Sequence, residues 1–543
     1  MNAAERLLPR PRRITELDGE FVLDEATRIL SDASTAGPGA LLQAVLRAST
    51  GLPLGDATGA GDRVIALSVD PSMADEAYLL SVTPGGVRIV GGSASGVGNG
   101  MQSFLQLLPP QVYRRATVHG MRWAAPACEV ADEPAFWWRG VMLDVARHFL
   151  PLHDVLRFVD LMAMHRLNVL HLHLTDDQGW RVQILRYPRL TEVGAWRRES
   201  QVGYGVDAPG DGRPHGGYYT QDDLRELVAY AAARGITVVP EIESPGHVQA
   251  AIAAYPELGV TDTQLEVGTR WGIIPNVLNA EEGTVEFFTN VLDEVLDVFP
   301  SEFIGVGGDE CVKDQWRADP RTQERMRELG VATEDELQSW FIRRLDAHLT
   351  ARGRRLFGWD EILEGGLASG ATVASWRGST GAVAAARAGH DVVLCPDETV
   401  YLNYRQSEHP DEPIPLVVVI TVRDVYEFDP VPAGLTEAER EHVLGGQANL
   451  WTEYIDSPRT LDYFAFPRLC ALAEALWTAG EREYDAFAAR LDAHLARLDA
   501  LGVEYRHADG PLPWQTRPGI PGRIDTRAAR AATVAALTAN IAP

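Results

Sequence analysis

The sequence lacks an excess of basic charge. Its 543 residues carry 49 lysines and arginines against 76 aspartates and glutamates, which gives a formal net charge of −27 at pH 7. A chain with this charge repels phosphate backbones and anionic lipid headgroups. We therefore expect neither nucleic acid nor a membrane as a partner, and we interpret the acidic residues mainly as a solvated surface.

Cysteines and long apolar runs are also scarce. No CxxC pair occurs among the four cysteines Cys128, Cys311, Cys395 and Cys470, so their spacing indicates neither a zinc cluster nor a disulfide framework. No window approaches the ~18 apolar residues of a membrane span, and MNAAERLLPRPRRITELDGEF contains no signal-peptide core. The expectation is a cytoplasmic protein, or a secreted one if a leader has been removed.

The chain is long enough for more than one hydrophobic core. With 45% hydrophobic and 23% charged residues, it has the composition of an ordinary globular protein, and its length favours two or three domains. Residues 1–133 contain short strand candidates, two helix candidates and a hairpin signal in YLLSVTPGGVRIVGG, which predict a small α+β domain. Residues 481–543 show helical spacing and are predicted to pack on the outside of the domain between these two segments.

That middle segment, residues 134–480, alternates short β-branched runs with amphipathic helices. The runs are RGVMLDV, NVLHLHLTD, ITVVPEIE, FIGVGGDE, RRLFGWDEI, ATVASWRG, DVVLCPDETVYLN and VLGGQANLW. Eight such units predict an α/β fold of the (β/α)8 TIM barrel class, in which functional groups follow the carboxyl ends of the strands. Polar and aromatic residues are found at those positions: Asp176, Asp177, Glu243, His247, Asp309, Glu310, Trp359, Trp376, Tyr401, Asn403, Trp451 and Glu453.

Two carboxylates stand side by side in GGDE, residues 307–310. Neighbouring strand residues point to opposite faces, so Asp309 and Glu310 can share one mouth only if the ladder has already ended. The two glycines permit the dihedrals of such an ending. A plain turn with two solvated acids is the alternative.

Adjacent acids do not suit the usual glycosidase arrangement. That arrangement sets two carboxyl groups ~5–9.5 Å apart across the sugar, whereas consecutive Cα atoms are only ~3.8 Å apart. A nucleophile is therefore missing, and a 2-acetamido sugar could supply it, because its amide oxygen can attack its own anomeric carbon. Glu310 would then act as acid and base, Asp309 would accept the acetamido N–H, and the closeness of the two charges should raise one pKa.

Six stretches occur in an order that resembles a known family. RGVMLDVARHF, NVLHLHLTDDQGW, VVPEIESPGH, GGDE, GWDEI and GGQANLWTEY together look like the family 20 glycoside hydrolases, the β-N-acetylhexosaminidases. The resemblance covers about residues 134–478, and residues 1–133 are similar to the family's accessory N-terminal domain. It implies substrate-assisted, retaining hydrolysis of an amino-sugar glycoside or oligosaccharide carrying terminal GlcNAc or GalNAc, with no cofactor and no metal, and it leaves the oligomeric state open.

The resemblance also implies roles for individual residues. Asp309 and Glu310 take the two acid roles, and Tyr401 would donate to the acetamido oxygen. Arg139 would grip ring hydroxyls with support from Asp176, and closure of the non-reducing side by Arg139 and Glu453 predicts exo action. The other predicted substrate-binding residues are His247 in the network beneath the acids, Asn403 on the same strand face as Tyr401, and the apolar walls Trp359, Trp376 and Trp451.

The sequence also leaves two alternative functions open, and it departs from the family pattern at two positions. His171 and His173 form an HxH on a barrel strand, which also suits metal ligation in an amidohydrolase-type barrel. A sugar-binding protein without catalysis is the second alternative, although adjacent buried charges oppose it. Gly305 stands where the family often has histidine, which predicts a gap or an enlarged lumen, and Glu243 replaces the usual aspartate, which puts its contact with His247 in question.

Overall fold

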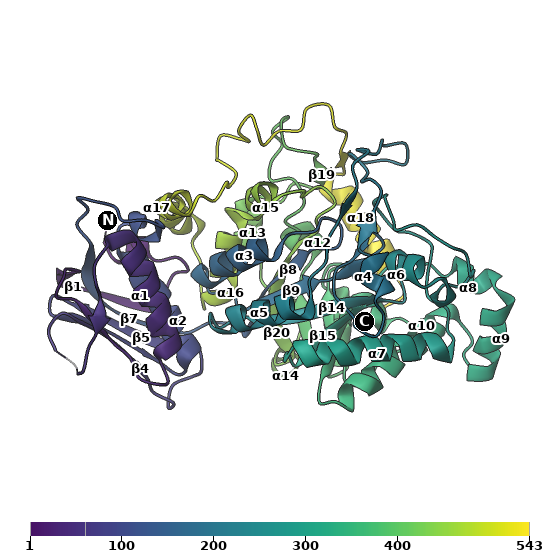
Figure 1. Cartoon of the computed structure of the whole chain (residues 1–543), viewed down its shortest axis with the longest axis horizontal. Coiled ribbons are helices and arrows are strands. Elements are labelled where there is room, and N and C mark those ends of the chain that lie inside the picture. Colours follow the sequence, from purple (N-terminus) through teal and green to yellow (C-terminus); the bar gives the residue numbers. More distant parts are fainter. Residues whose placement is uncertain (1, 60, 542–543) are drawn as a thin grey trace.

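The computed structural model describes residues 2–59 and 61–541 and contains an N-terminal sheet unit beside a larger barrel (Figure 1). The sheet has seven strands in the order β1-β7-β5-β6-β4-β2-β3. They are β1 (Arg13–Val22), β2 (Arg28–Leu30), β3 (Gly55–Asp56), β4 (Val64–Val69), β5 (Tyr78–Thr83), β6 (Gly86–Gly91) and β7 (Ala124–Asp132). Helices α1 (Ala36–Thr50) and α2 (Ala94–Leu107) complete the unit, and the predicted hairpin is formed by β5 and β6, which pair from Thr83 and Gly86 outward.

The second unit is a closed parallel barrel, as predicted. Its strands follow the order β14-β15-β16-β17-β18-β20-β8-β9, and each of the eight predicted runs overlaps one of them. They are β8 (Trp138–Asp144), β9 (Val169–His173), β14 (Thr237–Ser244), β15 (Phe303–Gly307), β16 (Arg355–Trp359), β17 (Thr372–Ser375), β18 (Val392–Leu394) and β20 (Val443–Leu450).

Helices and short strand pairs connect and follow the barrel strands. The longer helices are α3 (Leu152–Met164), α5 (Gln221–Ala232), α7 (Glu282–Val298), α9 (Pro320–Leu329), α10 (Glu334–Thr350), α11 (Thr380–Arg387), α15 (Pro458–Ala465), α16 (Arg468–Trp477), α17 (Tyr484–Leu501) and α18 (Arg527–Leu537). The shorter helices are α4 (Arg189–Glu192), α6 (Gln249–Ala254), α8 (Asp314–Ala318), α12 (Asp397–Val400), α13 (Val422–Glu427) and α14 (Glu437–Arg440). The small strands are β10 (Thr175–Asp176), β11 (Gly179–Trp180), β12 (Trp196–Arg197), β13 (His215–Gly216), β19 (Leu416–Val417) and β21 (Arg523–Ile524).

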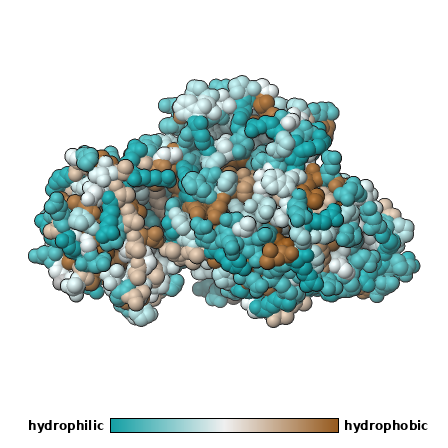
Figure 2. All heavy atoms as spheres, viewed as in Figure 1, coloured by the Kyte–Doolittle hydropathy of each residue, from teal (hydrophilic) through white to brown (hydrophobic). Residues whose placement is uncertain are grey.

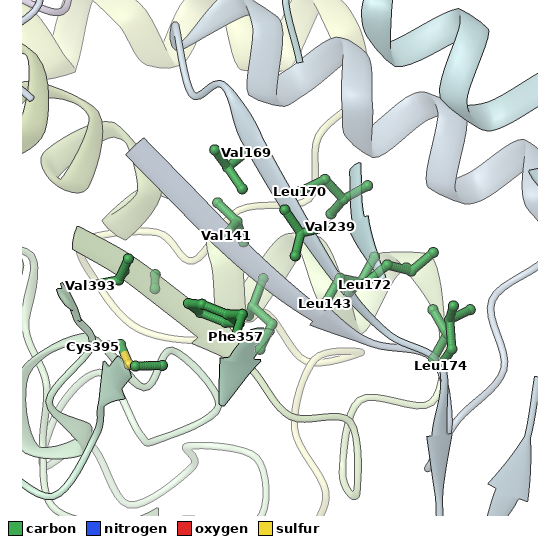
Figure 3. Close-up of a cluster of buried hydrophobic side chains, with 14 of the residues drawn as sticks. Val141, Leu143, Val169, Leu170, Leu172, Leu174, Val239, Phe357, Val393 and Cys395 are labelled. Atoms are coloured by element: carbon green, nitrogen blue, oxygen red, sulfur yellow. The ribbon is translucent and has the colours of Figure 1, made fainter. Parts of the chain in front are cut away.

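Alternation along each strand separates the barrel wall from its lumen. On β9, Leu170 and Leu172 belong to the large hydrophobic cluster with the surrounding helices, and Figure 3 shows them beside Val141 and Leu143 of the neighbouring strand. The intervening histidines point into the lumen. Burial of each such leucine contributes ~1.5–3 kcal/mol to the stability of the fold. The alternation therefore determines which residues of the strand face the lumen.

A shared polar contact joins the two units. The carboxylate oxygen Oδ2 of Asp132, the last residue of β7, accepts hydrogen bonds from Tyr78 Oη at 2.9 Å, from Trp477 Nε1 at 2.9 Å and from Arg166 Nη1 at 3.1 Å. Tyr78 belongs to the sheet unit, whereas Arg166 and Trp477 belong to the barrel unit. The sheet unit is thus bonded to the barrel through buried groups.

The tail after the barrel differs from its prediction. Helix α17 does pack on the barrel through Phe487 and Leu498, but Arg497 Nη2 of this helix also donates to the carbonyl oxygens of Arg6 at 2.8 Å and Gln106 at 2.6 Å. It therefore fills the seam between both units (Figure 1). Helix α18 instead contacts α12 at the barrel mouth.

The surface view is dominated by hydrophilic residues with small, separated apolar patches (Figure 2). Among the described helices, none is long and apolar enough to cross a bilayer. All four cysteines are buried and free of disulfides.

Candidate active site

The adjacent acids lie on a left-handed turn that begins where β15 ends. Gly307 and Gly308 have φ values of 71° and 93°, and Glu310 has φ 45°. A Cβ atom on Gly307 would lie 1.8 Å from Glu243 Oε2, so both conformation and space require glycine there. The prediction that the ladder ends before the acids is confirmed. A non-glycine residue with positive φ is strained, and such strain often accompanies functional sites.

A histidine lies beneath both acids. His247 Nε2 is 3.4 Å from Glu310 Oε2 and 3.7 Å from Asp309 Oδ2, while Nδ1 is 3.0 Å from Asp177 Oδ2 and 3.3 Å from Asp176 Oδ1. Burial opposes a charge on the imidazole, but these carboxylates outweigh it and raise the pKa of His247 well above its usual value. The site therefore contains an imidazolium that bridges two pairs of carboxylates.

The pKa of one acid is raised, as the two adjacent charges predicted. The pKa of Asp309 is raised to about 6: burial is the largest cause, His247 opposes the shift, and the neighbouring Glu310 charge adds to it. Burial is thus a larger cause than the like charge. The side chain of Asp309 is only 11% exposed, whereas that of Glu310 is 30% exposed, so Glu310 is the acid with access to an incoming group.

The prediction for Arg139 is wrong. Arg139 is the second residue of β8, at the amino end of the strand, and its side chain points outward. Its guanidinium forms a buried ion pair with Glu76 of the sheet unit, with Nη2 2.5 Å from Oε1, donates from Nε to the Arg166 carbonyl oxygen at 2.8 Å, and stacks over Trp477. Since the acids follow the carboxyl ends of the strands, Arg139 cannot reach a sugar held there.

Arg147 occupies the place assigned to Arg139. It follows the carboxyl end of β8, and its Nη2 lies 2.7 Å from Asp176 Oδ2. Nη1 is 3.3 Å from Asp144 Oδ2, and the guanidinium carbon lies 4.8 Å from the centroid of the Trp451 ring. Burial alone would raise the pKa of Asp176, but Arg147 holds it far below its usual range. The sequence signal was available, because Arg147 follows its strand as the other site residues do.

The aromatic residues predicted as apolar walls come together. Ring centroids are 5.7 Å apart for Trp359 and Trp451, 6.3 Å for Tyr401 and Trp451, and 6.1 Å for Trp376 and Tyr401. Glu361, which was not among the predicted site residues, supports this wall. Its carboxylate accepts a hydrogen bond from Trp376 Nε1 at 3.0 Å. The three tryptophans and Tyr401 thus form one continuous aromatic surface.

The strand predicted to carry Tyr401 and Asn403 is shorter than expected. β18 ends at Leu394, because Pro396 cannot continue the ladder and is the N-cap residue of the four-residue helix α12. Tyr401 and Asn403 therefore lie in the segment after α12, and the argument that they share a strand face is wrong. Asn403 is 7% exposed, and its amide oxygen has no hydrogen-bond partner among the described residues.

Glu453 lies beside Arg147 at the edge of the site. Burial raises its pKa and Arg147 opposes the shift, and its Oε2 has no partner in the described part of the chain. A polar cavity of about 400 Å³ adjoins it, lined in part by His148, Gln201 and Tyr454. The carboxylate is therefore free to accept a hydrogen bond from a bound molecule.

Glu243 and Gly305 depart from the family pattern with different outcomes. Neither carboxylate oxygen of Glu243 has a hydrogen-bond partner among the described residues, so the contact with His247 that was in question is absent. Burial, with Asp309 and Glu241 nearby, raises the pKa of Glu243 well above its usual value. The gap predicted at Gly305 is wrong, because Glu241 fills it: a Cβ atom at position 305 would lie 2.8 Å from the Cβ of Glu241.

The HxH pair belongs to a network of carboxylates in the lumen. His173 Nδ1 is 2.5 Å from Glu241 Oε2, and its Nε2 is 3.0 Å from Asp176 Oδ2. His171 Nε2 is 3.1 Å from Glu241 Oε2. Donor atoms of two buried groups, His173 with Glu241 and Glu243, and Asp176 with Asp177 and His247, are close enough to hold a metal ion. A metal at the first group would have to displace a hydrogen bond from His173, whose two ring nitrogens are both engaged.

Comparisons with known proteins agree with this geometry. Residues 136–480 match the model of the glycosyl hydrolase family 20 catalytic domain, and residues 4–133 match the model of domain 2 of that family. A β-hexosaminidase of Porphyromonas gingivalis is 43% identical over 517 residues, which cover 94% of this chain and 65% of that protein. This chain thus spans slightly less than two thirds of that relative's length.

Two solved structures are similar throughout the fold. The exo-β-N-acetylglucosaminidase of Vibrio harveyi, solved with N-acetylglucosamine, has a TM-score of 0.81 and 34% identity, and the match covers 93% of this chain and 78% of that one. The β-N-acetylhexosaminidase of Streptomyces coelicolor A3(2) has a TM-score of 0.81 and 30% identity, covering 96% and 99%. With both its sheet unit and its barrel matched, the chain belongs to glycosyl hydrolase family 20.

Proposed function

We propose that the protein is an exo-acting β-N-acetylhexosaminidase that removes terminal non-reducing GlcNAc or GalNAc residues with retention of configuration. The observation that carries this proposal is the placement of Asp309 and Glu310 on one turn, both above His247. Adjacent acids on one turn cannot flank a sugar ring as a nucleophile and an acid do. They suit a substrate that brings its own nucleophile.

In the first step, the substrate's amide oxygen attacks the anomeric carbon as the glycosidic bond breaks. Glu310 gives its proton to the departing oxygen, and Asp309 accepts a hydrogen bond from the acetamido N–H, where positive charge develops. The product is an oxazolinium ion and the free aglycone. Tyr401 would donate its hydroxyl to the amide oxygen and so fix the direction of attack.

In the second step, water opens the oxazolinium ring. Glu310, now ionised, takes a proton from the water, the new C–O bond forms at the anomeric carbon, and the amide oxygen leaves. Two inversions at one carbon give net retention. The aromatic wall of Trp359, Trp376 and Trp451 would exclude other water from the reacting atoms and strengthen the interactions with the charged intermediate.

Arg147 and Glu453 would bind the hydroxyl groups on the non-reducing side. Arg147 presents a rigid fork of donors whose own charge is balanced by Asp144 and Asp176, and Glu453 offers an unpartnered oxygen among the described groups. Together they would replace the predicted pairing of Arg139 with Glu453 and close the pocket behind the terminal sugar. Asn403 is proposed to reach the 6-hydroxyl.

A paired assay tests the proposal. Wild type, Glu310→Gln and Asp309→Asn are compared on p-nitrophenyl N-acetylglucosaminide and N-acetylgalactosaminide, and their affinity for a thiazoline that mimics the bicyclic intermediate is measured. Glu310→Gln should lose ~100- to 10,000-fold in turnover and still bind the thiazoline, whereas Asp309→Asn should lose both. Asp314→Asn, a variant of a carboxylate that is 79% exposed, is the matched control and should behave as wild type.

Four results would contradict the proposal. The first is cleavage of a p-nitrophenyl glucoside, which has a 2-hydroxyl in place of the amide, as fast as its 2-acetamido counterpart. Covalent trapping of the sugar on a side chain would show an enzyme nucleophile. Loss of activity on treatment with a chelator would favour the amidohydrolase-type alternative, and complete absence of p-nitrophenol release would favour a binding protein.

A further inference from the structure

The C-terminal helix α18 contacts both loops that carry the acetamido side of the site. It lies beyond the 136–480 match to the catalytic domain and beside α12 in Figure 1. The carbonyl oxygen of Leu537 in this helix accepts a hydrogen bond from Arg377 Nη1 at 3.1 Å. Arg377 directly follows Trp376, so one end of α18 is fixed to the loop after β17.

The other contact is made by Arg530, which is buried. Its Nε donates to Asp397 Oδ2 at 2.5 Å, and Nη2 contacts the same oxygen. The guanidinium carbon lies 6.0 Å from the centroid of the Trp376 ring. Arg530 thus touches the residue that opens α12 and the indole that faces Tyr401.

Asp397 connects the two loops. Its backbone N–H donates to the Trp376 carbonyl oxygen at 3.0 Å, and its Oδ2 also accepts from Tyr404 Oη at 2.9 Å. The other carboxylate oxygen has no hydrogen-bond partner among the described residues. A fully buried carboxylate with this few partners depends strongly on its single ion pair.

Helix α12 cannot hold Tyr401 in place by itself. It has four residues, and its first position is not capped by a side chain. A single helical turn has no stability of its own in water, because nucleation fixes several residues for one hydrogen bond. Its geometry must therefore come from tertiary contacts, and these include the buried Arg530–Asp397 ion pair.

We propose that Arg530 is a positioning residue for the acetamido pocket: through Asp397 and the Trp376 ring it holds Trp376 and Tyr401 at the spacing that the bent acetamido group requires. This inference rests on the proposed function, since it assigns the aromatic wall to the amide arm. The side-chain contacts of Arg530 given by the described residues are with Asp397 and the Trp376 ring, and neither Arg147 nor Glu453 is among them. Its loss should therefore loosen amide recognition and leave hydroxyl recognition intact.

The test compares Arg530→Met and Arg530→Lys with wild type. The matched control is Arg387→Met on helix α11, because Arg387 is 44% exposed and lies 3.9 Å from its partner Glu439. Each protein is assayed on N-acetyl and N-propionyl forms of p-nitrophenyl glucosaminide and on the N-acetylgalactosaminide, with melting temperatures measured in parallel. A misplacement of about 1 Å can lower a rate by about 100-fold, so we expect a loss of this order in kcat/KM for Arg530→Met.

Selectivity separates positioning from mere stability. Arg530→Met should discriminate less against the larger N-propionyl group, while its preference between GlcNAc and GalNAc stays that of wild type. Arg530→Lys, which keeps the charge, should recover part of the activity, and Arg387→Met should match wild type. Asp397→Asn should show the same loss, and the double variant with Arg530→Met should be no worse than either single variant, because both act through one contact.

Different results would overturn the role of Arg530 and the proposed function. Unchanged kcat/KM and N-acyl selectivity in Arg530→Met, or a loss that only follows the unfolded fraction, overturns the inference. So does an additive loss in the double variant. A wild type that hydrolyses no 2-acetamido glycoside overturns the proposed function itself, which distinguishes the two failures.

Discussion

Replacing Arg139 and Arg147 separately by methionine should separate the stability of the fold from its catalysis. The two arginines lie eight positions apart on the chain but at opposite ends of the same barrel strand. Both are buried and both form ion pairs. Only Arg147 lies at the end of the barrel that carries the acids, so only its removal should affect a bound sugar.

The size of each effect follows from the contacts. Arg139→Met leaves Glu76 without its counter-ion and removes a donor to the Arg166 carbonyl oxygen, and loss of one partner of a buried pair costs ~3–5 kcal/mol of unfolding free energy. Arg147→Met leaves Asp144 without its ion pair and removes the arginine partner of Asp176, which keeps His173 and His247, and a similar loss of stability is expected. It also removes a charged hydrogen bond to the substrate worth ~1.5–3 kcal/mol, or about 10- to 100-fold in kcat/KM.

The assay is steady-state kinetics at 25 °C, with the folded fraction of each protein determined by thermal unfolding. Both variants should melt several degrees below wild type. Per folded molecule, Arg139→Met should keep the wild-type kcat/KM, and Arg147→Met should lose at least tenfold. If Arg139→Met lost catalysis as Arg147→Met does, or if Arg147→Met kept it, the assignment of the two residues to opposite ends of the barrel would be refuted.

Three further predictions concern pH and backbone geometry. Because Asp309 acts in its ionised form and its pKa is raised to about 6, kcat/KM should rise with pH through about 6, and Asp309→Asn should lack this rising limb. A wild-type kcat/KM that does not rise through this range would contradict the assignment. Burial lowers the pKa of His165 to about 4, so the unfolded chain binds its proton first and stability should fall by up to about 3 kcal/mol as pH drops from about 6.5 to about 4; the melting temperature of His165→Gln should depend less on pH, and an equal dependence would refute this. Gly308→Ala should lose both activity and stability, because its Cβ would lie 2.5 Å from Ile362 at a φ of 93°, whereas Gly330→Ala, with φ 69° but open space, should show only the smaller backbone effect in thermal unfolding.

The barrel was predictable because its signal is repeated. Each of the eight strands lies within a run of apolar residues between helical segments, and the two histidines of β9 alternate with leucines that pack outward. An alternation with a period of two residues determines to which face of the sheet each side chain points, wherever one face is buried. The hairpin of β5 and β6 was equally clear, because a tight turn with glycine fixes its register.

The errors in the predicted site came from strand direction and strand length. In RGVMLDVAR both arginines flank one strand, and a matching motif does not say which end of the strand an arginine occupies. Parallel direction does, since a residue before the strand lies at the far end from a residue after it. At Tyr401, the proline at 396 ended the strand early, and this signal was present in the sequence.

The contributions of α18 and Glu361 could not be predicted in the same way. Arg530 meets Asp397 across more than 130 residues of chain, and neither residue stands in a motif. Their pairing depends on how the tail folds back over the barrel mouth. The cytoplasmic location and the domain limits remain predictions.

The bonding of Asp132 determines how the sheet unit can serve the enzyme. A buried carboxylate held at once by Tyr78, Arg166 and Trp477 fixes the sheet unit against the barrel, so we do not expect the sheet unit to move as an independent module. Separating the two units near residue 133 would expose Asp132, Arg166 and Trp477 to water without their hydrogen-bond partners. We therefore expect the barrel to depend on the sheet unit for its stability, and the two units to unfold in a single cooperative transition.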